Sequence, residues 1–337
     1  SNVESIYDVY QLNRDDCLIG VLPLFHSFGF TGTMWLPLLG GIRAVYHPNP
    51  VEGGVIGEMC RDHRGTILMS TPTFLLNYIR KVPAEHFATL RHVIVGAEKL
   101  KQRVADAFVE KFGVVPREGY GCTELSPVAM VNVPDFEGEH VQQKGSKPGT
   151  VGHPVPGVAA RIVGVDDGAL LSPGEPGLLL IKGPNVMLGY LNNEEKTREV
   201  IRDGWYVTGD IAVIDEEGFV SITDRLSRFS KIGGEMVPHL KIEEEIHAVL
   251  GANDQVCVVT SVPDEKKGEK LVVLVIRDIE ISALLSGLSA RGLPNLWIPK
   301  RENFFKIESF PVLGSGKLDL QQVKRIASDL AGKTNDS

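Results

Sequence analysis

The segment EGYGCTELSP, residues 118–127, holds the residue types best suited to chemistry. Its two glycines lack side chains, so the backbone can approach a ligand closely there. Tyr120 could place its ring on a nucleobase, Thr123 could bond to a phosphate oxygen, and the Glu124 carboxylate could bind Mg²⁺. An ordinary surface turn is the other interpretation, and composition alone does not decide between the two.

Two further segments carry charge where a nucleotide could bind. In GWYVTGD, residues 204–210, the Asp210 carboxylate could accept two hydrogen bonds from a sugar diol, or it could end an ordinary turn before the strand-like IAVID. The segment DRLSRFSKIGGEMVP, residues 224–238, brings together three cations, Arg225, Arg228 and Lys231. They could form a charged hinge that meets phosphate, or a solvated basic turn.

Three more candidates have simple alternatives. Lys317 lies in the string GSGK, but a phosphate loop requires Gly in place of Pro311 and Ser or Thr in place of Leu318, so an exposed loop lysine is the alternative. His26 ends a predicted buried strand and could line a pocket. Its string PLFHSFG resembles a nucleophile elbow with His in place of the first Gly, yet no Asp and His partners accompany it. Cys122 is expected to be a small buried residue rather than a nucleophile.

Length and composition limit the class of protein. A chain of 337 residues is expected to form two or three domains. Its 43% hydrophobic and 23% charged residues are typical of a soluble globular protein, and the net charge of −8 argues against a nucleic-acid or membrane-surface binder. The four cysteines show no disulfide or zinc spacing, which favours a reducing compartment, the cytoplasm.

One long stretch, Cys17–Ile42, contains no charged residue. A spanning helix needs about 20 mostly apolar residues. This stretch contains Pro23, Pro37 and five glycines, which would break one continuous helix. We expect a buried strand, a loop and a helix here, and no membrane span.

The elements that must hold the candidate residues follow from the hydrophobic patterns. Strand-like runs alternate with helix-like segments over residues 1–145, which predicts a largely parallel α/β sheet. Residues 146–223 are dense in Gly and Pro between short strand-like runs, which predicts a small antiparallel sheet or barrel. After a hinge at 224–231, residues 232–337 combine amphipathic helices with two apolar strands, which predicts an α+β domain.

The order and separations of the motifs are more specific than any one of them. From about residue 18 to residue 320 the chain resembles the core motifs of the adenylate-forming superfamily, through LPLFHSFG, GAEKL, YGCTE, GPNVMLGY, GWYVTGD, DRLSRFSKIGGEMV and PVLGSGK. This superfamily contains acyl-CoA synthetases, luciferases and the adenylation domains of non-ribosomal peptide synthetases. The residues of these motifs are most similar to those of the synthetase half of bacterial bifunctional 2-acylglycerophosphoethanolamine acyltransferase/acyl-[acyl-carrier-protein] synthetases.

The resemblance implies a large α/β core with a mostly parallel sheet and a small β-barrel-like subdomain, followed by a mobile α+β C-terminal domain. It also implies a two-step reaction with ATP and Mg²⁺. A fatty carboxylate attacks the α-phosphate to give acyl-AMP, and a phosphopantetheine thiol, that of acyl carrier protein, then takes the acyl group.

Two other functions stay open beside this one. A long-chain acyl-CoA ligase is the alternative enzyme, and an inactive adenylate-family binding module is the alternative from another class. The fragment is expected in the cytoplasm, and the inner face of a bacterial inner membrane is one place for its parent enzyme.

The resemblance assigns a role to each candidate residue. The residues matched to nucleotide contacts are Gly96, Ala97, Glu98, Tyr120, Gly121, Thr123, Asp210 and Arg225. Among them, Tyr120 matches the ring stacked on adenine, and Asp210 matches the carboxylate that binds the ribose hydroxyls. Glu124 matches the Mg²⁺ contact, and His26 matches a residue of the acyl pocket.

Two lysines match the two chemical steps. Lys317 corresponds to the lysine that bridges the acyl carboxylate and the α-phosphate during adenylation. Lys231 corresponds to a lysine that enters the site for the second step, after the small domain rotates. Both steps gain from positive charge placed where negative charge develops.

Two departures from the superfamily pattern matter. The phosphate-binding loop of the type TSGTTGxPKG is absent, and the resemblance places it shortly before residue 1. The chain is therefore expected to be a fragment of a longer enzyme, poorly active or inactive alone. Ser227 stands where many members have Lys or Asp at the hinge, so domain rotation could differ here.

Overall fold

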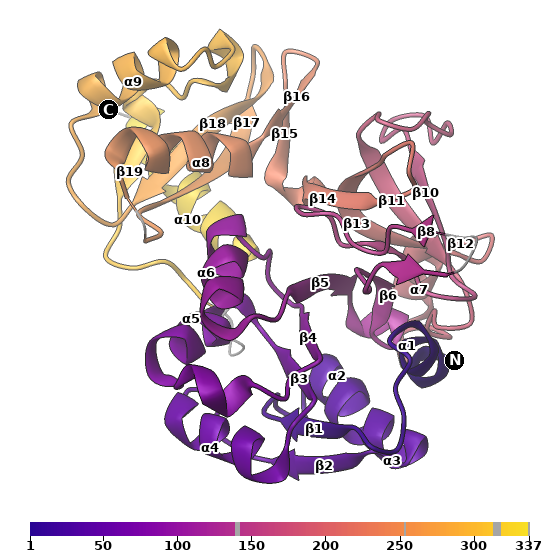
Figure 1. Ribbon diagram of the computed structural model, residues 1–337. Helices are drawn as coiled ribbons and strands as arrows, with labels where there is room; N and C mark the ends of the chain where they lie inside the picture. Colours follow the sequence, from indigo (N-terminus) through magenta and orange to yellow (C-terminus); the bar gives the residue numbers. More distant parts are fainter. Residues whose placement is uncertain (139–141, 253, 313–317, 336–337) are drawn as a thin grey trace. The chain divides into compact units, whose positions relative to one another are not determined.

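The computed structural model describes residues 1–138, 142–252, 254–312 and 318–335 (Figure 1). The chain forms two compact units, Ser1–Thr223 and Asp224–Ser337. A division of the first unit at residue 146 and a hinge over 224–231 stay predictions.

The first unit contains a seven-stranded sheet in the order β2-β1-β3-β4-β5-β6-β9. The first five strands in sequence pair in parallel, and β6 and β9 extend the sheet with antiparallel pairing. The predicted mostly parallel sheet is confirmed. The strands are β1 (Cys17–Gly20), β2 (Arg43–Tyr46), β3 (Ile67–Ser70), β4 (His92–Val95), β5 (Pro116–Gly121), β6 (Val128–Val131) and β9 (His153–Pro154).

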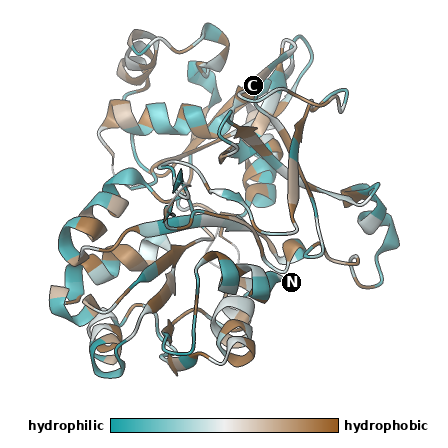
Figure 2. Ribbon diagram, turned by 45° about the vertical axis from the view of Figure 1, so that its right-hand side comes forward, coloured by the Kyte–Doolittle hydropathy of each residue, from teal (hydrophilic) through white to brown (hydrophobic). Residues whose placement is uncertain are grey.

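Helices cover both faces of this sheet. Along β1, Ile19 packs into one buried cluster and Leu18 into another, because successive side chains of a strand point to opposite faces. Figure 2 shows hydrophobic strands beside helices that alternate between teal and brown. One cluster takes its helical side chains from α4 (Gly53–His63), α5 (Pro72–Lys81) and α6 (Gln102–Phe112), and the other from α1 (Asn2–Val9) and α3 (Leu36–Gly40).

The uncharged stretch forms no long helix. It contains β1, the single turn α2 (Ser27–Gly29), the π-helical segment η1 (Phe30–Trp35) and α3. This is the strand, loop and helix expected from its prolines and glycines. Across the described ranges, no helix is long and apolar enough to cross a membrane.

A second, antiparallel sheet follows in the first unit. It has the order β10-β11-β13-β12, and β14 pairs with β13. An irregular register between Leu178 and Leu180 marks a bulge, a feature that bends a sheet. The β-barrel-like part of the prediction is confirmed as a curled sheet of β10 (Ala159–Val163), β11 (Gly177–Lys182), β12 (Ile201–Arg202), β13 (Trp205–Ile214) and β14 (Val220–Arg225), joined by helix α7 (Glu194–Val200).

The second unit is an α+β structure, as predicted. Its sheet has the order β16-β15-β18-β17, with β19 paired in parallel to β18. Buried clusters lie on both faces of this sheet, one with α8 and α9 and one with α10. The elements are β15 (Phe229–Ile232), β16 (Glu235–Pro238), α8 (His239–Leu250), β17 (Cys257–Asp264), β18 (Gly268–Val275), α9 (Ile281–Ala290), β19 (Phe304–Lys306) and α10 (Leu320–Asn335).

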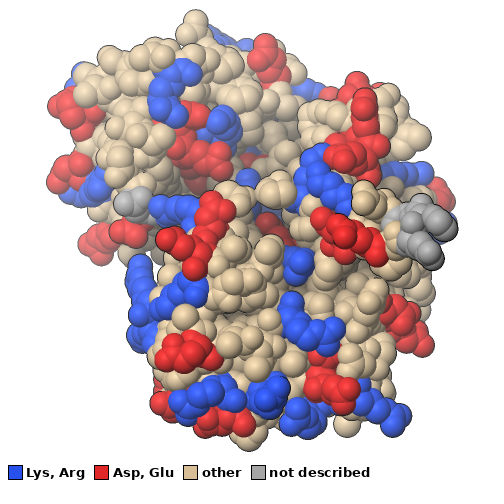
Figure 3. All heavy atoms as spheres, viewed as in Figure 1, with Lys and Arg blue, Asp and Glu red and all other residues tan. Residues whose placement is uncertain are grey.

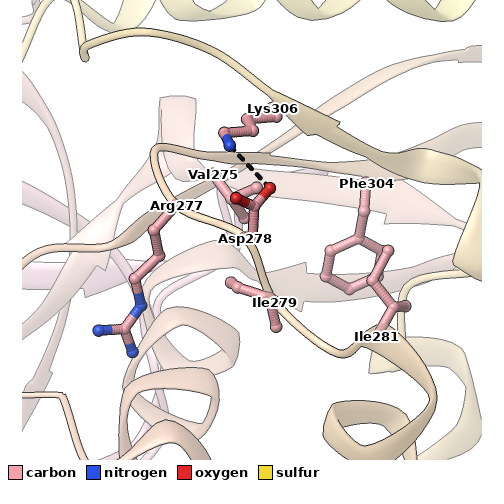
Figure 4. A pocket seen from close by; sticks show the side chains of 7 residues that line it. All are labelled: Val275, Arg277, Asp278, Ile279, Ile281, Phe304 and Lys306. Atoms are coloured by element: carbon pink, nitrogen blue, oxygen red, sulfur yellow. Dashed lines mark hydrogen bonds and ion pairs between the residues drawn. The ribbon is translucent and has the colours of Figure 1, made fainter.

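A small cavity lies in the second unit, at the end of β18. Its lining includes Ile279, Ile281 and Phe304, and the Lys306 ammonium pairs with Asp278 at 2.7 Å on its rim (Figure 4). Its volume is about 140 Å³, below the ~300–1,000 Å³ of usual ligand sites. This cavity is therefore too small for a nucleotide.

The visible surface carries both signs of charge. Figure 3 shows Lys and Arg side chains interspersed with Asp and Glu, and neither sign covers a large area of that face.

Candidate active site

The ends of the parallel strands place the first group of candidate residues. Ligands of open α/β sheets bind outside the carboxyl ends of the strands. Gly96, Ala97 and Glu98 follow β4 directly, and Thr123 and Glu124 follow β5 on a single helical turn. The structure thus carries two predicted motifs to the same edge of one sheet.

Hydrogen bonds connect the loops at this edge. The hydroxyl oxygens of Ser27 and Thr123 lie 3.1 Å apart, and the Thr73 hydroxyl donates to Glu98 Oε2 at 2.7 Å. His26 caps the short helix α2, since its Nδ1 accepts the Phe28 backbone N–H at 3.2 Å. The loops after β1, β3, β4 and β5 therefore line one polar rim, and the His26 motif is part of it.

Two glycines of the rim have a steric role. A Cβ on Gly96 would lie 3.2 Å from the Phe28 ring, and a Cβ on Gly121 would overlap the Pro127 carbonyl. Both positions bring backbone close to a neighbouring segment, which only glycine permits without a shift. The contacts explain these glycines by packing, and a ligand contact at Gly121 stays a prediction.

Tyr120 and Asp210 form one pair. The Tyr120 hydroxyl donates to Asp210 Oδ2, which joins β5 of the first sheet to β13 of the second. Burial raises the pKa of Tyr120 well above its usual value, and the Asp210 carboxylate adds to this rise, so the phenol keeps its proton. Asp210 is only 6% exposed, and its N–H donates to the Thr208 hydroxyl at 3.0 Å. The predicted base-stacking ring and ribose-binding carboxylate thus lie in direct contact.

Glu124 is held by a residue that sequence reasoning did not single out. The Tyr190 hydroxyl donates to Glu124 Oε1 at 2.7 Å, and the Met187 N–H donates to the Glu124 carbonyl at 2.8 Å. Tyr190 is the last residue of the motif GPNVMLGY, which the sequence analysis identified. The sequence did not indicate that Tyr190 contacts Glu124. Burial raises the pKa of the neighbouring Cys122 to about 12, so its thiol keeps its proton. Cys122 is only partly buried, although a buried position was expected.

The remaining candidates belong to the second unit. Arg225 ends β14 and is exposed, and its N–H donates to Asp224 Oδ1 at 2.8 Å. Lys231 is exposed on β15, where its N–H donates to Glu269 Oε2 at 2.7 Å. Ser227 is in the 3₁₀ turn Leu226–Arg228. Lys317 lies outside the described residues.

Arg228 is part of a buried charged cluster. Its Nη2 lies 2.5 Å from Glu243 Oε1, and its Nε lies 3.8 Å from Asp224 Oδ1. The Arg228 side chain is 13% exposed and both carboxylates are 4% exposed. The prediction that Arg228 is a solvated or phosphate-facing cation is therefore wrong. Arg228 forms an internal ion pair, because Glu243 of α8 and Asp224 at the end of β14 place buried carboxylates beside it.

Comparison with known proteins settles the family. The family of AMP-binding enzymes matches residues 1–191. The chain belongs to this AMP-binding enzyme family. The chain is 32% identical over 275 residues to the long-chain-fatty-acid–CoA ligase of Bacillus subtilis, covering 80% of this chain and 46% of that protein. It is 31% identical over 322 residues to the feruloyl-CoA synthase of an Amycolatopsis species, covering 93% and 62%.

Solved structures of relatives share the fold of this chain. ATP-bound MatB from Rhodopseudomonas palustris has a TM-score of 0.81 and 29% identity, covering 98% of this chain and 63% of that one. The o-succinylbenzoate–CoA synthetase MenE of Bacillus subtilis, in complex with ATP and magnesium, has a TM-score of 0.78 and 25% identity, covering 95% and 64%. The chain thus spans about half to two thirds of the length of these relatives.

Glu118, beside the predicted adenine site, should make the stability of the protein depend on pH, because its carboxyl group is buried. Burial raises the pKa of Glu118 to about 7. A group with a raised folded-state pKa stabilises the protein fully below its unfolded pKa, near 4.3, and this stability is lost as pH rises through 7. We expect Glu118→Gln to remove that loss, at most on the order of 3 kcal/mol. Urea denaturation at pH 5 and pH 7.5 measures it, and an unchanged pH dependence in the variant would contradict it.

Proposed function

We propose that the chain is the nucleotide-binding and lid-bearing part of an acid–thiol ligase that activates a fatty acid as acyl-AMP. One observation carries the proposal: Tyr120, Thr123 and Glu124 lie at the end of β5, and Tyr120 bonds to Asp210 on β13 of the second sheet. This set contains a hydroxyl and a carboxylate for phosphate and metal, with a ring and a second carboxylate for the nucleoside. Family membership supports the reaction class.

In the first step, a fatty carboxylate oxygen attacks the α-phosphorus of ATP. The bond from that phosphorus to the bridging oxygen breaks, and pyrophosphate leaves with the negative charge. Thr123 would bind a phosphate oxygen, and Lys317 would neutralise charge shared by the carboxylate and the α-phosphate. Gly96, Ala97, Glu98 and Tyr120 would hold the adenine, Asp210 and Arg225 the ribose, and His26 the acyl chain.

In the second step, a phosphopantetheine thiolate attacks the acyl carbonyl. The C–S bond forms, the bond from carbonyl carbon to phosphate oxygen breaks, and AMP leaves. Lys231 would supply positive charge in this step. Holding both reactants in line accounts for much of the rate expected from such a site.

The donor set of the site fits Mg²⁺. In the described part of the chain, no group of three or more His, Cys, Asp and Glu side chains could hold a metal ion. Mg²⁺ suits such a site, because it is commonly bound by one or two carboxylates together with substrate phosphates. Glu124 would be the carboxylate, and the ion would neutralise charge on the phosphate oxygens.

Acyl carrier protein is the proposed acceptor, and CoA is the second candidate. The resemblance of the motif residues to acyl-[acyl-carrier-protein] synthetases favours the carrier protein, whereas several relatives are named as CoA ligases. The exposed cations Arg225 and Lys231 suit either an acidic carrier protein or the phosphates of CoA. A binding module without activity is disfavoured, because Tyr120, Thr123 and Glu124 are all present.

Hydroxylamine capture tests the proposed activity. With ATP, Mg²⁺ and a fatty acid, the complete gene product should form acyl hydroxamate. A second arm supplies acyl carrier protein or CoA at equal concentration, and we expect more acylated carrier protein. A folded gene product that binds AMP but yields no hydroxamate would favour the binding module, and a preference for CoA would reverse the choice of acceptor.

A further inference from the structure

The hydrogen bond from Tyr190 to Glu124 has a direction fixed by chemistry. An ionised carboxylate can only accept hydrogen bonds, so the Tyr190 phenol is the donor and Glu124 is the acceptor. The bond occupies Glu124 Oε1 at 2.7 Å. A carboxylate oxygen in such a bond cannot rotate freely, although the terminal torsion of a glutamate is otherwise broad.

Tyr190 is held in place from its other side. Its N–H donates to the Thr197 hydroxyl of α7 at 2.9 Å, and that hydroxyl donates to the Asn193 carbonyl at 2.9 Å. The preceding Gly189 has a φ of 154°, and a Cβ there would lie 2.7 Å from Thr197 Cγ2. The backbone of Tyr190 is therefore tied to α7 by contacts that do not involve Glu124.

Backbone contact adds a second constraint on the same turn. The Met187 N–H donates to the Glu124 carbonyl at 2.8 Å. The segment from Met187 to Tyr190 thus contacts both the main chain and the side chain of Glu124. A purely space-filling tyrosine would need neither the hydroxyl contact nor its alignment with one carboxylate oxygen.

We propose that Tyr190 is a positioning residue that holds the Glu124 carboxylate so that it presents a single oxygen to the metal of a nucleotide complex. The inference rests on the function proposed above. Partners of metal ligands that orient them typically contribute 10–100-fold to metal affinity. Tyr190 would add the ordering that a lone carboxylate on a short turn lacks.

The test compares Tyr190→Phe with Tyr46→Phe. The Tyr46 hydroxyl, on β2, also makes one hydrogen bond of 2.7 Å, to the Thr33 carbonyl of η1. The first readout is the Mn²⁺ concentration at which half of the complex between the complete gene product and ATP has bound the metal. The EPR signal of free Mn²⁺ measures this concentration. The second is the affinity for AMP without metal, measured by calorimetry.

We expect Tyr190→Phe to raise the half-saturating Mn²⁺ concentration about tenfold or more and to leave AMP affinity within about twofold. Tyr46→Phe should change neither. In a Glu124→Ala background, Tyr190→Phe should add no further loss, because the carboxylate that the hydroxyl contacts is gone. Equal weakening of Mn²⁺ and AMP binding, or an undiminished effect without Glu124, would overturn the positioning role.

Failure of the proposed function gives a different result. A folded wild-type protein that binds neither AMP nor Mn²⁺·ATP would reject nucleotide binding itself, and the positioning role with it. A wild-type protein that binds both, with an unchanged Tyr190→Phe, would reject the positioning role alone.

Discussion

Replacing Arg228 by methionine is expected to lower the free energy of unfolding of the second unit by about 3–5 kcal/mol. The substitution removes the cation that lies 2.5 Å from Glu243 and leaves that buried carboxylate uncompensated. Glu243 Oε1 also accepts the Val259 N–H at 2.7 Å, so it cannot turn away without breaking a bond to β17. Urea denaturation followed by hydrogen exchange of peptides from α8 and β17 measures the loss in the full chain.

The loss should depend on pH in a direction set by the carboxylates. Burial raises the pKa of Glu243 and of Asp224 even with Arg228 present. A raised pKa favours the folded state at low pH, so the cost of a missing cation should shrink as pH falls and Glu243 takes up a proton. A loss of equal size at pH 5 and pH 8 would point to lost packing of the arginine stem instead.

The double variant Arg228→Met, Glu243→Gln is the matched control. Removing both charges together costs less than removing Arg228 alone, because Glu243 no longer stays buried as an uncompensated ion. We expect the double variant to recover most of the stability lost by Arg228→Met. A double variant as unstable as the sum of the single ones would show that the two side chains act independently.

Replacing Lys317 by alanine is expected to slow acyl-adenylate formation by about 10²–10³-fold in the complete gene product. The lysine is assigned to charge that develops between the acyl carboxylate and the α-phosphate. Thioester formation from supplied acyl-AMP does not involve that charge and should be largely unchanged. Hydroxamate yield reports the first step, and acylation of the thiol by acyl-AMP reports the second.

Lys231→Ala provides the reverse comparison. It should slow transfer from acyl-AMP to the thiol and leave hydroxamate formation near the wild-type rate. Its exposed position on β15 makes a loss of folding unexpected. If both variants reduced both steps equally, the assignment of one lysine to each step would be wrong.

Much of the fold follows from local patterns. Strands such as Ile67–Ser70 and His92–Val95 are short apolar runs between helices with amphipathic spacing, so the parallel sheet was predictable. The helix Gln102–Phe112 ends at Gly113 in the left-handed conformation, as its sequence predicts. These features depend on neighbours a few residues away, which a single sequence displays directly.

The contacts that organise the site were not predictable in this way. Tyr120 and Asp210 are 90 residues apart, and Glu124 and Tyr190 are 66 apart. Such pairs depend on how segments far apart in the sequence pack together, which no local pattern encodes. Arg228 illustrates the limit, since its sequence neighbourhood indicated an exposed basic turn while α8 supplies a buried acid.

The Tyr120–Asp210 pair has a consequence for how a nucleoside would be recognised. Asp210, the acceptor proposed for the ribose, is buried, and its carboxylate accepts a hydrogen bond from Tyr120, whose ring is proposed to stack on the base. The base and the sugar would therefore be bound by two side chains, Tyr120 and Asp210, that hold each other in place. Their contributions to affinity should then be non-additive: a nucleoside with a poorly stacking base would lose part of its ribose recognition as well.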